Sequence, residues 1–385
     1  MDESWIINHL GEDHDSPHAP VAPPLVRSNN FSFPTVAAMR EAVQIEFDAP
    51  FYTRGHNPTV ALLREKLAAL EHAEDALVFS SGAGAMTAAV MAFLRAGDHV
   101  VCIDKPYSWT RKLLVDLLAR FGVEHTFVDA TDPGAYRSAC RANTKLFLLE
   151  SPNSLTFEVT DLAAVAAIAR EKGALTICDN SHSGPLYQHP IVLGIDLTMH
   201  TASKFINGHG DVVAGVIAGR KEHVRRIMAN EFMTLGAVVS PADAWLMLRS
   251  LRTLPLRMER SAGSAERIAP YLAEHPKVKE VYWPFLPQHP QVELARRQMR
   301  RCTGLLSIRV KAPDEAAVER FCDRLERFRM AVSWGGYESL VFPVCALKGP
   351  SGYYTDLPWD LVRLYIGLDD PEALLRDLDQ ALAAI

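Results

Sequence analysis

The chain has no excess of basic residues and no paired cysteines. Its 385 residues include 40 Lys and Arg against 46 Asp and Glu, which gives a net charge of −6 at pH 7. Nucleic-acid-binding domains usually carry a basic patch, so no nucleic-acid partner is expected. The six cysteines form no CxxC pair, which disfavours a disulfide framework and a zinc site. We therefore expect reduced thiols in a cytoplasmic protein.

We also expect no secretory leader and no uninterrupted membrane span. Residues 1–25 are polar and acidic rather than basic and then apolar. Residues 76–94 carry no charge over a membrane-spanning length, but the small-residue stretch SSGAGAMT interrupts them. We interpret this segment as a buried strand, a loop and a helix, and expect no membrane association. The 14 histidines contain no helical HxxxH pair and no Cys/His cluster, so no metal site is predicted.

Strand and helix patterns alternate over nearly 200 residues. Helical spacing is clearest in VALLREKLAALEHA (60–73), and each later strand pattern is followed by a helical one. This alternation predicts an open, mostly parallel sheet that is covered on both faces. The expected strands are ALVF (76–79), HVVCID (99–104), EHTFVD (124–129), KLFLLE (145–150), ALTICDN (174–180), IDLTMH (195–200) and VVAGVIAG (212–219).

The two ends of the chain differ from this central part. Prolines disfavour regular structure in residues 1–50, which we interpret as an N-terminal arm. Beyond residue 245 the pattern predicts a long helix with a break at Pro255, followed by strand, helix, strand and helix. We therefore divide the chain into an arm (1–50), a large domain (51–245) and a smaller C-terminal α/β domain (246–385).

The glycine-containing loop at 80–87 is a candidate phosphate site. It precedes a helix, and backbone N–H groups at a helix N-terminus bind phosphate. Gly82-Ala83-Gly84 resembles the start of a dinucleotide fingerprint, and Asp104 closes the next strand, but position 87 is threonine instead of the third glycine. A monophosphate cofactor such as pyridoxal phosphate fits this loop as well, and so does a small-residue turn without a ligand.

Two further residues decide between these alternatives. Asp179 ends an apolar strand, where a carboxylate can hold a proton on a pyridine nitrogen or can simply cap a turn. Lys204 lies between Thr201, Ser203 and nearby glycines, which suits a Schiff-base lysine, although a surface lysine is the ordinary alternative.

The order of these features favours one class of enzyme. A phosphate loop, a strand-end aspartate and a lysine flanked by hydroxyls follow each other as a fold-type I pyridoxal phosphate enzyme requires. A nucleotide-dependent oxidoreductase has no use for the lysine turn. A non-catalytic binding platform would not need Lys204 and Asp179.

Several long segments resemble the Cys/Met metabolism (trans-sulfuration) enzymes from about residue 45 onward. The segments ESPNS (150–154), SWGGYESL and LVRLYIGLDD (361–370) are most similar to bacterial cystathionine β-lyases. The family segments are FYTRGHNPT (51–59), SSGAGA (80–85), CDNSHSGP (178–185), HTASKFINGHGDVVAG (200–215) and SWGGYESL (333–340).

The resemblance implies a fold-type I architecture that binds pyridoxal 5′-phosphate. The expected fold has a mostly parallel seven-stranded sheet and a smaller C-terminal α/β domain. Lys204 would carry the cofactor as a Schiff base and then move the substrate's proton. Asp179 would pair with the pyridinium nitrogen, and Tyr107 would stack on the ring. The phosphate would be held by the backbone of Gly82 and Ala83 and by the hydroxyls of Thr201 and Ser203.

The resemblance also implies a substrate site and an assembly. Arg363, together with Ser333 and Trp334, would hold the amino-acid substrate, because a guanidinium fork matches the two carboxylate oxygens. Tyr52 and Arg54 would reach the cofactor phosphate of a neighbouring subunit. The implied assembly is a homotetramer of two catalytic dimers with shared active sites.

The expected reaction is β-elimination of cystathionine to homocysteine, pyruvate and ammonia. The alternative is a γ-acting trans-sulfuration enzyme: cystathionine γ-synthase, cystathionine γ-lyase or methionine γ-lyase. Val332 stands where many γ-acting relatives carry glutamate and some β-lyases carry tyrosine; we take it to favour the γ-acting alternative. Trp334 and Ser154, which replaces a common asparagine, favour the β-lyase. His182 stands where an aromatic residue is common.

Overall fold

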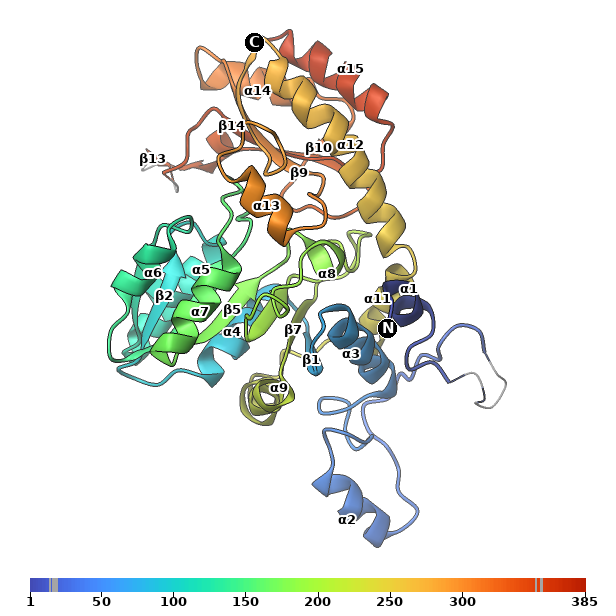
Figure 1. The fold of residues 1–385 in the computed structure, drawn as a ribbon. Helices are drawn as coiled ribbons and strands as arrows, with labels where there is room; N and C mark the ends of the chain where they lie inside the picture. Colours follow the sequence, from blue (N-terminus) through green and yellow to red (C-terminus); the bar gives the residue numbers. More distant parts are fainter. Residues whose placement is uncertain (14, 16–19, 350–351, 354–355) are drawn as a thin grey trace.

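A seven-stranded mixed sheet forms the centre of the large domain in the computed structural model, which describes residues 1–13, 15, 20–349, 352–353 and 356–385 (Figure 1). Only β7 runs antiparallel to its neighbours, so the mostly parallel sheet is confirmed. In spatial order the strands are β1 (Asp75–Phe79), β7 (Gly215–Gly219), β6 (Leu197–His200), β5 (Leu175–Asp179), β4 (Thr144–Glu150), β2 (His99–Ile103) and β3 (Glu124–Val128).

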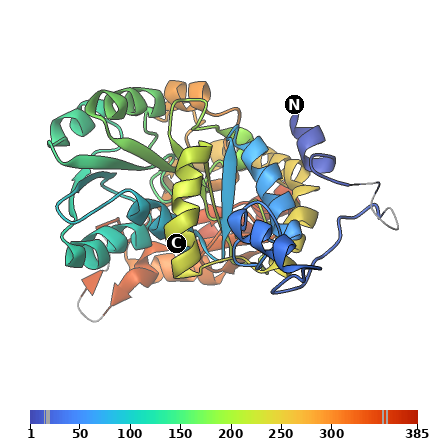
Figure 2. The ribbon, with the colours of Figure 1, turned by 90° about the horizontal axis from the view of Figure 1, so that it is seen from below.

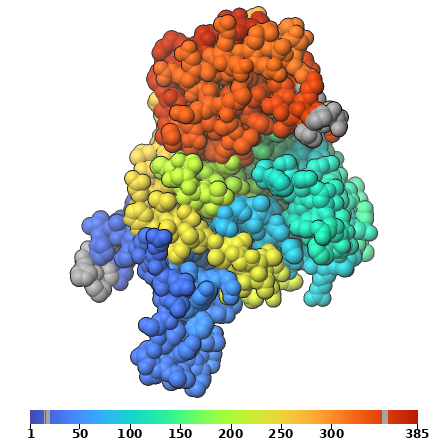
Figure 3. Space-filling model, turned by 180° about the vertical axis from the view of Figure 1, so that it is seen from behind, coloured from blue at the N-terminus to red at the C-terminus, as the bar shows by residue number. Residues whose placement is uncertain are grey.

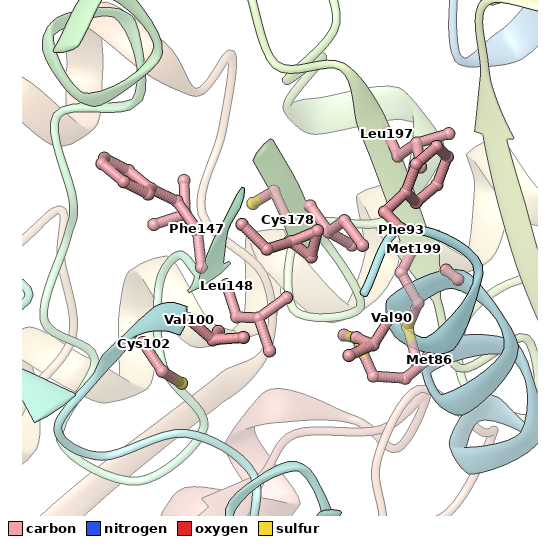
Figure 4. Packing of buried hydrophobic residues seen from close by; sticks show 14 of the residues in the cluster. Met86, Val90, Phe93, Val100, Cys102, Phe147, Leu148, Cys178, Leu197 and Met199 are labelled. Carbon is pink, nitrogen blue, oxygen red and sulfur yellow. The ribbon is translucent and has the colours of Figure 1, made fainter. Parts of the chain in front are cut away.

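Both faces of this sheet are buried. Along β1, Leu77 and Phe79 belong to one apolar cluster, whereas Ala76 and Val78 belong to another. Because side chains alternate along a strand, the two clusters lie on opposite faces. Figure 4 shows part of the first cluster, in which Met86 and Val90 lie near Met199. Burial on both faces explains why the strands appear in the sequence as continuous apolar runs.

Helices cover both faces of the sheet: in Figure 2, green helices lie above and teal helices below the strands at the left of the view, and the blue helix α3 lies beside β1. The helical segments are α3 (Pro58–Leu70), α4 (Gly82–Ala92), α5 (Ser108–Lys112), η1 (Leu113–Leu117), η2 (Leu118–Phe121), α6 (Pro133–Ala139), α7 (Leu162–Lys172), α8 (Gly184–Tyr187), α9 (Lys221–Ile227), η3 (Met228–Phe232), α10 (Met233–Leu235) and α11 (Pro241–Leu251).

Two predicted helix ends can be compared with the structure. Helix α4 ends at Ala92, so the prediction that it continues to Gly97 is wrong; Phe93 already closes the helix with N–H bonds to the carbonyls of Met91 and Val90. The helical stretch that begins at α5 ends before Gly122 as predicted. Gly122 has φ +74°, a left-handed conformation that glycine adopts without strain.

The C-terminal domain holds a second sheet of five strands. Their order is β10 (Phe328–Met330), β11 (Ser339–Pro343), β14 (Leu361–Tyr365), β9 (Leu305–Val310) and β8 (Val278–Tyr282). The domain also contains α12 (Leu254–Glu274), α13 (Val292–Gln298), α14 (Glu315–Asp323), η4 (Val344–Leu347), a small pair β12 (Lys348–Gly349) and β13 (Gly352–Tyr353), and α15 (Pro371–Leu382).

A short elbow joins the two domains. The predicted long helix breaks at residues 252–253, between α11 and α12, and α12 continues into the C-terminal domain (Figure 1). Pro255 lies in the first turn of α12 and not at the break, because the first turn needs no N–H from proline. The predicted domain boundary at residue 245 lies inside α11, which packs on α3.

The N-terminal arm contains two helices, α1 (Glu3–Asn8) and α2 (Val36–Gln44), so the expectation of little regular structure is wrong there. Asp2 and Thr35 cap them through side-chain oxygens, and the arm's prolines lie outside both helices. Helix α1 is docked, because Lys66 Nζ donates to the carbonyls of Ile6 and Ile7. Helix α2 projects from the body of the molecule (Figure 3).

Three global features concern the described residues only. None of their helices combines the length and apolar character needed to cross a membrane. None of their His, Cys, Asp and Glu side chains gather in threes as a metal site would require. All six cysteines are free thiols.

Candidate active site

A cavity at the carboxyl ends of the central strands brings together residues that are far apart in sequence. Open α/β sheets bind ligands at this edge. Five predicted site residues line the cavity, one of which, Trp334, comes from the C-terminal domain. The lining residues are Tyr107, Glu150, Ser154, Asp179, Ser181, His182, Thr201, Lys204 and Trp334.

Lys204 lies in a tight turn that follows β6. Its Nζ donates a hydrogen bond of 2.6 Å to Ser333 Oγ and lies 4.2 Å from the centre of the Trp334 ring. Burial, and then the positive charge of Arg363, lower the pKa of Lys204 to about 8. About a tenth of this amine is therefore unprotonated at pH 7, far more than for an ordinary lysine, and the unprotonated form is the one that attacks a carbonyl.

The partner of Lys204 is held in an unusual backbone conformation. Ser333 has φ +110°, which L-residues rarely adopt and which is typical of strained functional sites. Gly335 follows with φ +83°, and a Cβ added there would lie 2.5 Å from the N atom of Phe205. The segment after Ser333 is therefore pressed against the lysine turn, and this contact joins the two domains.

Asp179 ends β5 and is almost fully buried while facing the cavity. Its Oδ1 accepts the N–H of Ser181 at 2.9 Å. Burial raises the pKa of Asp179, while the Ser181 hydrogen bonds and the charges of His200 and Lys204 act in the opposite direction. A carboxylate in this position gains from a further cationic partner, and the protonated ring nitrogen of pyridoxal phosphate is one.

The N-terminus of α4 provides a phosphate-sized cradle. In the part of the chain that the structure describes, the N–H groups of Gly82 and Ala83 have no acceptor, while Ser81 caps Gly84. A Cβ on Gly82 would lie 2.3 Å from Thr201 Oγ1, so the helix start touches the lysine turn. These donors fit the phosphate group of pyridoxal phosphate. Asp179 fits its ring nitrogen, and Lys204 fits its aldehyde.

Ser203 does not line this cavity. Its hydroxyl donates to the carbonyl of Ala214 at 3.3 Å and accepts the N–H of Ala214 at 3.0 Å. In this arrangement Ser203 connects the lysine turn to the start of β7, and Thr201 is the hydroxyl that faces the cavity.

Glu150 lines the cavity beside Tyr107, and the sequence analysis did not single it out. Its Oε2 accepts the backbone N–H of Tyr107 at 2.6 Å. Burial and the nearby Asp179 raise the pKa of Glu150 to about 8, and burial also raises that of Tyr107. The available signal was that Glu150, like Asp179, ends an apolar parallel strand.

Arg363 lies on β14 behind the cavity wall and is buried. Its Nη1 donates to the carbonyl of Ser154 at 3.1 Å, and its Cζ lies 4.9 Å from the Trp334 ring and 5.2 Å from the Phe342 ring. Burial lowers the pKa of Arg363 to about 10, so the guanidinium stays charged at neutral pH. A buried cation between two aromatic rings is suited to binding a carboxylate.

Tyr52 and Arg54 lie apart from this cavity. Tyr52 is exposed, and the Arg54 Cζ lies 5.7 Å from its ring. Arg54 lines a different cavity with His56 and Arg64. The structure therefore does not bring these two predicted residues to the Lys204 site of their own chain.

Two buried groups support the lysine turn from behind. His200 Nε2 lies 2.6 Å from Glu71 Oε1, and both side chains are almost fully buried. Arg257 on α12 donates to the carbonyl of Phe205 at 2.9 Å and to that of Ser250 at 3.0 Å. Sequence reasoning missed Glu71 and Arg257 because each acts on the turn from a distant element.

Comparison with known proteins places the chain among pyridoxal phosphate enzymes. A family described as Cys/Met metabolism PLP-dependent enzyme matches residues 5–383. L-methionine gamma-lyase of Treponema denticola is 36% identical, over 94% of this chain and 92% of that protein. Cystathionine gamma-synthase of Mycobacterium tuberculosis is 37% identical, over 97% of this chain and 95% of that protein. The crystal structure of metB from Corynebacterium glutamicum has a TM-score of 0.93 at 34% identity and covers 100% of this chain and 98% of that one.

Proposed function

Because the chain belongs to the Cys/Met metabolism PLP-dependent enzyme family, we propose that it breaks or forms a carbon–sulfur bond at the γ-carbon of a sulfur amino acid. Pyridoxal 5′-phosphate is its cofactor. The observation that carries the γ-assignment is the similarity, over nearly the whole length, to cystathionine gamma-synthase and L-methionine gamma-lyase. This favours the alternative reaction over the β-elimination expected from the sequence segments.

The residues of the cavity divide this chemistry between them. Pyridoxal phosphate supplies an electron-withdrawing ring, and Asp179 holds the proton on its nitrogen. Lys204 Nζ takes the proton from the substrate's α-carbon, and Ser333 orients that amine. Arg363 binds the substrate carboxylate. Cleavage at the γ-carbon also requires removal of a proton from the β-carbon, and we assign this to Lys204 as well, after its amine has given up the first proton.

β-Elimination of cystathionine is the second candidate, and Trp334 favours it. The Trp334 ring packs between Lys204 Nζ and the Arg363 guanidinium, so a bulky wall stands beside the substrate. Trp334 stands in the sequence segment shared with β-lyases, whereas the exposed Val332 next to Ser333 remains the feature that favours the γ-acting assignment.

Product identity separates the candidates. The holoenzyme is incubated with L-cystathionine, with L-methionine, and with an O-acylhomoserine plus L-cysteine. We expect 2-oxobutyrate from L-cystathionine or from L-methionine, or else cystathionine from the O-acylhomoserine and L-cysteine. Pyruvate with homocysteine would replace the γ-assignment by β-elimination, and no turnover of any of them would contradict the proposed substrate class.

We also propose a homotetramer of two catalytic dimers, in the cytoplasm. Tyr52 and Arg54 support the assembly, because they follow the arm directly and lie apart from the site of their own chain. Helix α2 adds exposed apolar side chains at Val36, Met39 and Val43. Light scattering on a gel-filtration column tests this, and a monomer would contradict it.

A further inference from the structure

The turn at residues 153–157 connects the active-site cavity to Arg363. It follows β4 in the large domain, and Ser154 within it lines the cavity. The Ser154 carbonyl accepts a hydrogen bond of 3.1 Å from Arg363 Nη1, which belongs to β14 of the C-terminal domain. Among the residues that the structure describes, this carbonyl is the one hydrogen-bond acceptor of the Arg363 side chain. The turn therefore helps to set the direction in which the guanidinium faces.

The side chain of Asn153 organises this turn. It is almost fully buried. Its Oδ1 accepts the backbone N–H groups of Leu155, Thr156 and Phe157 at 3.4, 3.0 and 2.8 Å. The same oxygen also accepts the Thr156 hydroxyl at 3.1 Å. One side chain thus supplies the acceptor that these N–H groups would otherwise need from regular secondary structure.

A second set of contacts fixes Asn153 itself. Its Nδ2 donates to Glu158 Oε2 at 3.1 Å, and its backbone N–H donates to the Glu158 carbonyl at 3.2 Å. Lys105 Nζ binds the other carboxylate oxygen of Glu158 at 2.5 Å. Lys105 lies two residues before Tyr107, so this network also joins the turn to the Tyr107 segment. An amide suits the position, because one end must accept and the other must donate.

The backbone of the turn needs this support. Phe157 has φ +54°, a left-handed conformation that is costly for a bulky residue, and its side chain is fully buried. The hydrogen bond from the Phe157 N–H to Asn153 Oδ1 holds that conformation. Without this bond the turn can relax, and the Ser154 carbonyl, which lies in the same turn, moves with it.

We propose that Asn153 is a positioning residue that aims the Arg363 guanidinium at the substrate carboxylate by holding the Ser154 carbonyl in place. The inference rests on the proposed role of Arg363 as the carboxylate-binding residue. A guanidinium binds a carboxylate through two parallel hydrogen bonds, so its orientation decides how well both of them form. An arginine that is already oriented also loses less conformational freedom when the substrate binds.

The test uses butyrate, which carries a carboxylate but no amine that could react with the cofactor. Its binding to the holoenzyme is measured by calorimetry for the wild type and for Asn153→Leu, which has a similar shape but no hydrogen-bonding group. We expect the dissociation constant of butyrate to rise at least about tenfold in Asn153→Leu, because Arg363 loses its orientation. With the substrate that the product assay identifies, KM should rise while kcat changes less than about threefold.

The affinity for pyridoxal phosphate separates positioning from general support of the site. Fluorescence titration of apo-Asn153→Leu should give an affinity within about twofold of the wild type, because no contact of Asn153 reaches the phosphate cradle or the lysine turn. If butyrate and pyridoxal phosphate lost affinity by the same factor, Asn153 would support the site as a whole and the proposal would be wrong.

A double variant tests the hydrogen bonds apart from the shape of the side chain. Asn153→Asp keeps the acceptor for the turn but places a carboxylate against that of Glu158, so butyrate should bind more weakly. Adding Glu158→Gln returns a donor to this contact at unchanged net charge and should restore the affinity for butyrate to within about twofold of the wild type. No recovery in the double variant would contradict the proposal. Should Asn153→Leu not fold, these two variants take its place.

Two further variants keep the outcomes distinct. Asn143→Leu removes a matched asparagine whose hydrogen bond to the Gly97 carbonyl lies at the surface, and it must keep the wild-type affinity for butyrate. Arg363→Met must abolish butyrate binding; if butyrate binds this variant as well as the wild type, the role of Arg363 fails. If Arg363 is needed but Asn153→Leu keeps the wild-type affinity, only the inference about Asn153 fails.

Discussion

At the scale of single residues, Lys204 depends on the groups around it for its reactivity. Ser333 orients its amine, Trp334 covers it, and Arg363 disfavours its charged form. All three of these residues come from the C-terminal domain, at positions that follow Lys204 by more than a hundred residues. The lysine turn therefore becomes reactive only when both domains are in place.

The lowered pKa of Lys204 predicts how cofactor attachment varies with pH. The rate at which added pyridoxal phosphate binds covalently at Lys204 of the apo-protein should rise with pH and level off above about 8, because the amine is then unprotonated. Absorbance after mixing at a series of pH values measures this rate. Lys204→Ala is the control and should show no covalent band.

The cause of this shift can be tested with Arg363→Met. Removing the positive charge should move the midpoint upward, toward the ordinary lysine value, because Arg363 is the main lowering group after burial. A midpoint unchanged in Arg363→Met would mean that burial alone sets the pKa of Lys204.

A second residue-scale prediction concerns the contact between the phosphate loop and the lysine turn. Gly82→Ala should weaken pyridoxal phosphate binding at least about tenfold, because its Cβ would lie 2.3 Å from Thr201 Oγ1 and must push the two segments apart. Fluorescence titration of the apo-protein measures this affinity. The matched change Gly84→Ala meets Ser81 Oγ only at 3.1 Å and should have a much smaller effect.

Sequence reasoning found the residues that stand in contiguous motifs. Lys204 and Asp179 were predicted because each has a local signal: hydroxyls around a lysine, and an acid at the end of a strand. Glu150 has only the second signal, and Arg257 has none that is local. Its role depends on where α12 crosses the lysine turn, which is a matter of tertiary packing.

At the scale of elements, the elbow between α11 and α12 holds the lysine turn. Arg257 donates to the carbonyls of Phe205 and Ser250 and to the hydroxyl of Thr253. It presses against Gly208, where no Cβ would fit. The elbow therefore satisfies the carbonyl groups that the end of α11 and the lysine turn leave open. The sequence predicted a break in this helix but placed it at Pro255. The observed position depends on Arg257, a side chain of the next helix that satisfies the carbonyl of Ser250 near the end of α11.

Loss of Arg257 should loosen this elbow. We expect Arg257→Met to lower the free energy of unfolding by about 3 kcal/mol, because buried carbonyl groups lose their donors. Urea unfolding of the apo-protein measures the change. Arg260→Met on the exposed side of the same helix should cost less than about 0.5 kcal/mol, since Arg260 only contacts the Asp369 carbonyl at the surface.

At the scale of the whole molecule, the N-terminal arm is docked on its own subunit at one end and projects from it at the other. Its first helix is fastened to the body through Lys66, Glu12 and Arg252, which form a cluster of buried and half-buried charges. Its second helix projects away (Figure 3), and Tyr52 and Arg54 follow that helix in the sequence. A segment that is anchored at one end and projects at the other is suited to reaching a second subunit.

Shared sites predict complementation between two inactive variants. Arg54→Ala and Lys204→Ala should each lose most activity, and mixed assemblies should regain about a quarter of it, because each heterodimer contains one intact site. Turnover after co-expression measures this recovery. If the sites were built within single subunits, the mixture would be no more active than its parts.

The position of β7 has a consequence for how the chain is made. In the sheet β1 pairs only with β7, and β7 follows all the other strands in the sequence. During translation, β1 and the phosphate loop after it therefore cannot pack against β7 until residues near 219 have emerged from the ribosome. Gly215 of β7 packs on Ser81 so closely that no Cβ fits between them. Non-local pairing of this kind forms slowly and leaves a strand edge open to aggregation meanwhile. During translation, the first strand of the large domain is thus a segment that a chaperone would have to shield until β7 has emerged.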